Sequence, residues 1–89
     1  MKLKINKKDC KLEDLKIPRG YRLLEDWEVL KESRTNNEVY ELLKEGGIWC
    51  NTHKGKRAAG FIFIDGDFLV YGGINIGNTG RSRGVFVKK

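Results

Sequence analysis

The chain has 89 residues, 39% of them hydrophobic, and a net charge of +6. That length predicts a single domain, residues 1–89, whose core is too small to bury a deep substrate cavity. No apolar run approaches the roughly 20 residues that cross a bilayer, and no apolar stretch follows the basic start MKLKINKKDC, which excludes a membrane partner and a signal peptide and favours a cytoplasmic protein.

The charge is unevenly distributed along the chain. Residues 1–19 carry +4, residues 20–45 carry −3 and residues 46–89 carry +5. If the two ends lie together in the fold, the protein has a dipolar surface with one basic side. Basic surfaces attract nucleic acid, anionic lipid and acidic proteins alike.

The first element in chain order is a short strand at residues 3–5, where Leu3 and Ile5 share one face and lysines take the other. The sequence CKLEDLKIPRG follows as an irregular connection. Its single proline favours extended geometry in the preceding residue and comes just before a turn at Arg19-Gly20.

A helical period then predicts an amphipathic helix over residues 24–34. Apolar side chains recur at intervals of three and four, with acids between them and in the first turn, where the helix dipole favours negative charge. We expect Trp27 to lie in the core. The recurring apolar residues are Leu23, Leu24, Trp27, Val29 and Leu30.

A second helix is expected at residues 37–45. Thr35 and Glu38 match the spacing of a capping box, and Gly46-Gly47 ends the helix. These two helices share an acidic outer surface, which accounts for the negative charge of the middle of the chain.

The remaining residues favour β structure. Strands are expected at residues 48–52, 58–64, 68–71 and 85–87, with a basic turn at 53–57. Asp65-Gly66 between two β-rich runs is a strong hairpin signal. A two-residue loop there would place Phe63 opposite Phe68, Ile62 opposite Leu69 and Phe61 opposite Val70, and the hairpin, apolar on both faces, would be central in the sheet and covered twice.

This order of elements predicts an α+β fold: two short helices packed on a mainly antiparallel twisted sheet. The first and last strands are both short and bordered by lysines. Pairing them at one edge would bring the two basic ends together.

The stretch GYRLLEDWEVL, starting at Gly20, resembles the opening of short C-type-lectin-like domains, in the group that also contains the formylglycine-generating enzymes. In that group a tryptophan strand, a hairpin, a Gly/Asn-rich loop and a final strand follow. Here the similar segments are WCNT at 49–52, FIDG at 63–66 and GRSRGVFV at 80–87. The resemblance covers roughly residues 17–88 and implies a C-type-lectin-like scaffold with a binding role.

The departures from the family pattern limit what carries over. Leu24-Glu25 replaces the Pro-Thr that follows Arg-Leu in the family, and Phe86 stands where the family often has cysteine. No Glu-Pro-Asn or Gln-Pro-Asp triplet is present, so the sugar chemistry of true C-type lectins is not implied. The paired catalytic cysteines of the formylglycine-generating enzymes have no counterpart by spacing.

The glycine-rich segment 72–84 has two interpretations. Its glycines could present backbone N–H groups to an anion, with Arg81 and Arg83 as bidentate partners. Alternatively it is a surface loop that delivers the last strand, with glycines serving positive φ and close packing, and this interpretation is favoured. The segment lacks the spacing of a phosphate-binding loop, and no helix follows it.

No group of residues predicts an active site, a metal site or a cofactor. Cys50 and His53 are three apart in a strand and so point to opposite faces, while Asp65 and Asp67 flank a turn. Two cysteines are too few for a disulfide scaffold. A Cys10–Cys50 bridge stays open, and two reduced thiols are favoured.

We therefore expect a non-enzymatic binding module that presents the loop 72–84 and the basic turn 54–57 to a protein with an acidic surface. The alternative is a nucleic-acid-binding protein that uses the same side chains on phosphates. Either hypothesis requires that these two segments share one surface. The candidate contact residues are Lys54, Lys56, Arg57, Asn75, Asn78, Arg81 and Arg83.

Overall fold

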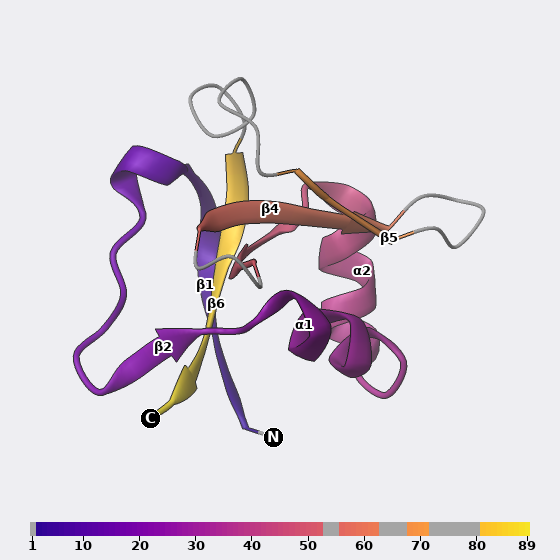
Figure 1. The fold of residues 1–89 in the computed structure, drawn as a ribbon, viewed down its shortest axis with the longest axis horizontal. Coiled ribbons are helices and arrows are strands. Elements are labelled where there is room, and N and C mark those ends of the chain that lie inside the picture. The colour runs from indigo at the N-terminus through magenta and orange to yellow at the C-terminus, as the bar shows by residue number, and fades with distance from the viewer. Residues whose placement is uncertain (1, 53–55, 63–67, 72–80) are drawn as a thin grey trace.

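The computed structural model describes residues 2–52, 56–62, 68–71 and 81–89, and for 61–62 and 68–71 only the backbone. Two helices lie beside one mixed, mostly antiparallel sheet, as Figure 1 shows, so the predicted α+β class is confirmed. The elements are β1 (Leu3–Lys11), the 3₁₀ turn η1 (Leu12–Asp14), β2 (Tyr21–Leu23), α1 (Asp26–Ser33), α2 (Asn37–Glu45), β3 (Ile48–Asn51), β4 (Arg57–Ile62), β5 (Phe68–Tyr71) and β6 (Arg81–Lys88).

The last strand, β6, is the centre of the topology. The sheet order is β1-β6-β3-β4-β5, and β2 also pairs with β6. On one side β6 runs antiparallel to β1, and on the other it meets antiparallel β2 near Phe86 and parallel β3 near Gly84. The predicted pairing of the first and last strands is confirmed, and it brings the two ends of the chain together (Figure 1).

Both terminal strands are longer than the sequence pattern indicates. β1 continues from residue 5 to Lys11, with a register shift between Ile5 and Asp9, and β6 begins at Arg81 rather than 85. The lysine-rich stretch after Ile5 has no apolar alternation, so backbone hydrogen bonds to β6, rather than a buried side-chain face, make it a strand. Residues 81–84 are accordingly strand and not loop.

The sheet has an apolar cluster on each face because side chains alternate along its strands. On the helix-covered face, Val85 and Ile48 pack with α1 and α2. On the other face, Phe86 and Trp49 pack beneath the connection between β1 and β2, where Leu15 is buried. Trp49 is fully buried, and its Nε1 donates to the Cys10 carbonyl oxygen at 2.9 Å, which ties β3 to β1 across β6.

The first helix begins two residues later than predicted, and its tryptophan lies outside the core. Glu25 caps α1 in a reciprocal box with Glu28, whose side chain accepts from the Glu25 amide at 2.9 Å. The buried positions of α1 are Glu28 and Val29. That inward face leaves Trp27 61% exposed, so the expectation of a core tryptophan is wrong.

The second helix has the predicted bounds but a different cap. The side chain of Asn36, not that of Thr35, accepts from the amides of Glu38 (3.0 Å) and Val39 (3.3 Å). An asparagine at this position satisfies amides that the first turn leaves without a helical partner.

The hairpin of β4 and β5 has a different register from the one predicted. Ile62 pairs with Phe68 and Phe61 with Leu69, each one residue earlier in β4 than a two-residue loop at 65–66 requires. The connecting residues 63–67 lie outside the described part of the chain. Among the described strands β5 ends the sheet, so the hairpin as a whole is not central.

Gly84 is needed for packing. A Cβ there would lie 2.7 Å from Asn6 Nδ2, 2.8 Å from Phe86 Cζ and 3.2 Å from Leu15 Cδ1. These neighbours belong to β1, β6 and the connection that covers this face. The favoured interpretation of the segment as glycines placed for packing therefore applies to Gly84.

We predict that Gly84→Ala lowers the free energy of unfolding by about 1–3 kcal/mol, the usual cost of overpacking a filled core. The measurement is urea denaturation followed by circular dichroism. Gly46→Ala is the matched control, because a Cβ at Gly46 meets only the Arg81 carbonyl oxygen, at 3.7 Å. Equal stability of the two variants would contradict this assignment.

Candidate functional site

The structure separates Arg57 from Arg81 and Arg83, which the sequence grouped into one contact surface. Lys54, Asn75 and Asn78 lie outside the described residues. Arg57 lines a hollow of about 520 Å³ beside residues 17–23, on the sheet face away from the helices. Arg81 and Arg83 line another, of about 410 Å³, at the C-terminal end of α2.

Strand alternation explains this separation. Arg57 shares its face with Ala59, which pairs with Trp49 in the cluster opposite the helices. Arg83 shares its face with Val85, which packs against the helices. Among the described residues, the hypothesis of one patch containing Arg57, Arg81 and Arg83 is therefore wrong.

The two arginines before Val85 stabilise the irregular part of β1. Arg83 Nη1 donates to the Asn6 carbonyl oxygen at 2.9 Å, within the register shift between Ile5 and Asp9. Arg81 Nε lies 3.4 Å from Asp9 Oδ1 in an exposed ion pair. Their hollow also includes the acids Asp9 and Glu45, so it has mixed charge and less attraction for an anion.

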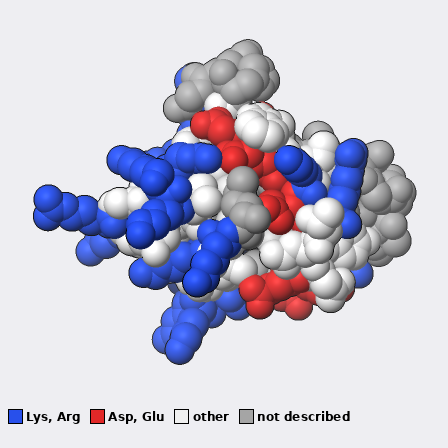
Figure 2. Space-filling view, turned by 90° about the horizontal axis from the view of Figure 1, so that it is seen from below, with Lys and Arg blue, Asp and Glu red and all other residues white. Residues whose placement is uncertain are grey.

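A different group of cations does share one surface, and we call it the basic face. It includes the 520 Å³ hollow and a neighbouring one of about 290 Å³, and Tyr21 lines both. Figure 2 shows Lys and Arg side chains gathered over one half of the molecule seen from below. The basic face consists of Lys2, Lys4, Arg19, Arg57, Lys88 and Lys89.

The sheet itself assembles the basic face. Tyr21 in β2 pairs with Lys88 in β6, and β1 brings Lys4 to the other side of β6, opposite Phe86. The Lys4 ammonium lies 5.3 Å from the centroid of the Tyr21 ring, a cation–π distance. Among the described residues, none of the six cations forms an ion pair with an acid.

Arg22 borders the same hollow but is already neutralised. Its Nη1 donates to Glu28 Oε1 at 2.7 Å and its Nη2 to Oε2 at 3.1 Å, with 39% of the arginine side chain and 4% of the glutamate side chain exposed. The Arg22 hydrogen bonds hold the pKa of Glu28 below its ordinary value against the effect of burial, and the same contact raises the pKa of Arg22. This pair joins β2 to α1.

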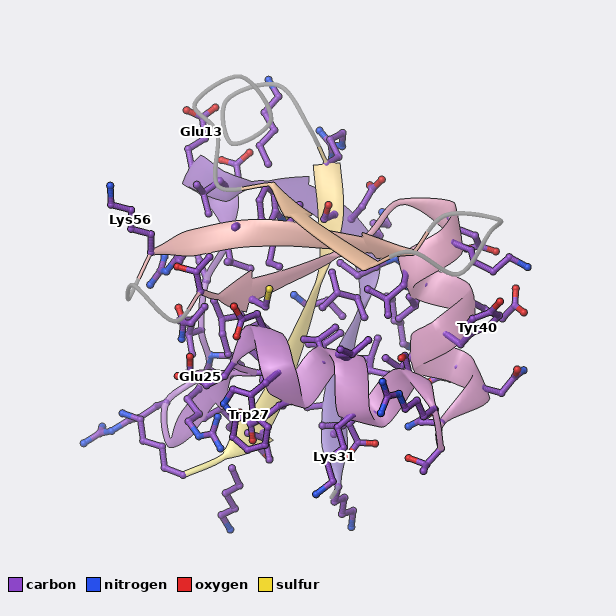
Figure 3. All side chains as sticks on the ribbon, turned by 45° about the vertical axis from the view of Figure 1, so that its right-hand side comes forward. Glu13, Glu25, Trp27, Lys31, Tyr40 and Lys56 are labelled. Carbon is purple, nitrogen blue, oxygen red and sulfur yellow. The ribbon has the colours of Figure 1, made fainter. Side chains whose placement is uncertain are left out.

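An acidic segment borders the basic face. Glu25 forms an isolated parallel bridge with Asn51, which lines the 520 Å³ hollow. Figure 3 shows Glu25 and Trp27 together at the start of α1, with the indole pointing away from the sheet. The segment that carries the exposed tryptophan therefore begins at the rim of the basic hollow.

The two thiols lie on opposite faces of the sheet. Cys50 is buried in the helix-side cluster, whereas Cys10 packs on the other face, and both are free. Burial raises the pKa of Cys50 to about 12 and also raises that of Cys10. His53 lies outside the described residues, and within the described ranges no group of acids, cysteines or histidines could hold a metal ion.

Five of the six basic-face residues are missing from the sequence-based site. Lys2, Lys4, Arg19, Lys88 and Lys89 come from three segments of the chain. Two sequence signals pointed to them: the positive charge of both ends and the expected pairing of the terminal strands. The sequence did not predict the strand β2 or its pairing with β6. That pairing brings Tyr21 and Arg19 to the basic face.

Comparisons with protein-family models, curated proteins and solved structures found no match for this chain. In the described part of the structure no helix is long and apolar enough to cross a membrane.

We predict that Glu28→Gln lowers the free energy of unfolding at pH 7 by about 2 kcal/mol, a typical value for a hydrogen bond to a charged group. Because the folded protein lowers the pKa of Glu28, the carboxylate stabilises it above the unfolded pKa, about 4.3, and this contribution is lost as pH falls through the folded pKa. The free energies of unfolding of the wild type and Glu28→Gln should therefore converge in acid.

Urea denaturation from pH 7 to about pH 3 measures these free energies, with exposed Glu41→Gln as the control. A difference that does not change with pH would contradict the assignment.

We predict that a thiol reagent at about pH 8 modifies Cys10 in the folded protein and reaches Cys50 only after denaturation, because the thiolate is the reactive form. Mass spectrometry of Cys10→Ser and Cys50→Ser variants assigns each event. Denatured, unreduced wild type that takes up no reagent would show a bridge and disprove the assignment of free thiols.

Proposed function

We propose that this protein is a non-enzymatic binding module whose basic face binds a protein with an acidic surface. The observation that carries the proposal is the gathering of six cations, without ion-pair partners among the described residues, over two adjacent hollows. A surface of one charge sign attracts ligands of the other sign and accelerates their association.

The chemistry of the hollows favours a protein over nucleic acid. The larger hollow combines its cations with the partly exposed side chains of Ile17, Pro18 and Tyr21, and so offers contacts for apolar and acidic groups together. Proteins that bind single strands use free aromatic rings as stacking platforms beside cations. Here the Lys4 ammonium lies over the Tyr21 ring, and the exposed Trp27 follows directly after Glu25 and Asp26.

The scaffold that we propose is C-type-lectin-like. The order of elements supports it: a short strand at Tyr21–Leu23, a helix pair, a strand with Trp49, a hairpin and a final strand. The segments 53–55 and 72–80, with Lys54, Asn75 and Asn78, remain candidate contacts. Two free thiols fit a cytoplasmic location.

We predict that Arg19→Glu/Arg57→Glu weakens binding of an acidic, leucine-containing peptide at least tenfold, because it replaces attraction with repulsion across the larger hollow. Fluorescence anisotropy with dilute protein measures the affinity. The matched control is Lys7→Glu/Lys8→Glu, which makes the same charge change at the hollow of Arg81.

An oligothymidylate of equal charge is the competing ligand, measured at about 50 and about 200 mM salt. The proposal requires that the peptide bind more tightly at both salt concentrations. Tighter binding of the oligonucleotide, with a steep fall as salt rises, would replace the proposal with a nucleic-acid function.

A further inference from the structure

The side chain of Trp27 lies outside the core clusters, and its exposure makes it available for contact at an interface. Trp27 is the large hydrophobic side chain that is exposed among the described residues. The inward face of α1 is made by Glu28 and Val29, so the core does not need the indole. Tryptophan is strongly enriched among the residues that dominate binding energy at protein interfaces.

The chain carries a matching receptor for this side chain. The 520 Å³ hollow has an apolar wall from the half-buried Ile17, Pro18 and Tyr21, together with the cations Arg19 and Arg57. Such a lining is complementary to a ligand that has an aromatic ring beside carboxylates. Glu25, Asp26 and Trp27 form a segment of this kind in sequence.

The segment begins at the rim of the hollow. Glu25 bridges to Asn51 on the rim of the hollow, and Figure 2 shows acidic side chains running beside the basic half of one face. A two-fold axis that lies in the plane of that face, parallel to the boundary between its acidic and basic parts, places the acidic part of one molecule over the basic part of another, and the reverse. Such an interface is isologous and closed, with two identical contacts.

We propose that the protein forms a two-fold homodimer in which Trp27 of each copy enters the hollow lined by Ile17, Tyr21 and Arg57 of the other. The carboxylates of residues 25–26 then face Arg19 and Arg57 across the interface. This inference rests on the basic face described under the proposed function and names a second copy as one of its acidic partners. We choose a second copy as the partner because each chain carries both the acidic segment and the basic hollow, and two copies are therefore complementary in charge.

Sedimentation equilibrium tests the proposal. The wild type should show a monomer–dimer equilibrium whose dissociation constant rises with salt, as expected for opposite charges at the interface. Trp27→Ala should raise that constant by about 30-fold or more, the effect of removing a strong hot-spot residue. Because the indole is exposed, we expect this variant to keep its fold, and circular dichroism is the check.

Charge reversal sharpens the test. Arg57→Glu and Asp26→Lys should each weaken the homodimer, and an equimolar mixture should dimerise again, since both contacts of the mixed dimer then pair opposite charges. Lys8→Glu, at the mixed-charge hollow, should leave dimerisation unchanged. Trp27 fluorescence should shift to the blue with concentration in wild type, whereas Trp27→Phe leaves buried Trp49 as an unchanging signal.

The outcomes separate this inference from the proposed function. A wild type that stays monomeric at the highest soluble concentration, or a Trp27→Ala variant that dimerises as well as wild type, would overturn the dimer. Peptide binding measured on dilute protein is independent of that result. Loss of peptide binding with an intact dimer would instead overturn the acidic-protein function and leave self-association as the use of the hollow.

Discussion

The structure depends on β6 being hydrogen-bonded on both sides. Its eight residues, Arg81–Lys88, have β1 along one side, with β2 and β3 in succession along the other. Three earlier strands, β1, β2 and β3, and the last strand are thereby fixed to one another. The alternation of Val85 and Phe86 divides the interior into a helix-side cluster and a second cluster beneath residues 12–20. Without β6 the sheet would not hold together, because β1 and β2 pair with no other strand among the described residues.

The same strand creates the electrostatic character of the surface. A chain with basic ends has no basic face until the ends are adjacent, and the pairing of Leu3 with Val87 makes them so. Tyr21, opposite Lys88, then places the turn containing Arg19 at the same end of the sheet. The Arg22–Glu28 pair removes one cation from this field and anchors α1 beside it. The result is a boundary: cations on the strands, acids at the start of the helix.

The sequence predicted correctly those elements whose bounds are set by neighbouring residues. The bounds of α2 follow from an apolar stripe between a cap and two glycines, and they are confirmed. The pairing of β1 with β6 followed from two lysine-bordered strands at the chain ends. The order of the other elements was also predicted, because each change of period marks a change of structure, but η1 and β2 were not expected.

What the sequence did not predict depends on contacts between distant residues. The extra length of β1 comes from its partner strand, and the carbonyl oxygen of Asn6 within its register shift accepts from Arg83, 77 residues later. Trp27 is apolar and correctly spaced for a helical core stripe. It is exposed because α1 turns Glu28 inward to meet Arg22, a partner in another element. The predicted single patch was wrong for a similar reason: Arg57 and Arg83 are both strand residues, and their strands fix them to opposite faces.

The closeness of the acidic and basic regions has a functional consequence. A partner protein and a second copy would use the same cations, Arg19 and Arg57, so one molecule cannot satisfy both at the same hollow. Self-association would then reduce the concentration of open sites, and a partner would have to supply more binding energy than the Trp27 contact it replaces. Because both equilibria weaken with salt, ionic strength alone does not favour one over the other. The concentrations do favour one over the other. A high concentration of this protein promotes the homodimer, whereas a high concentration of the partner promotes the complex of one copy with the partner.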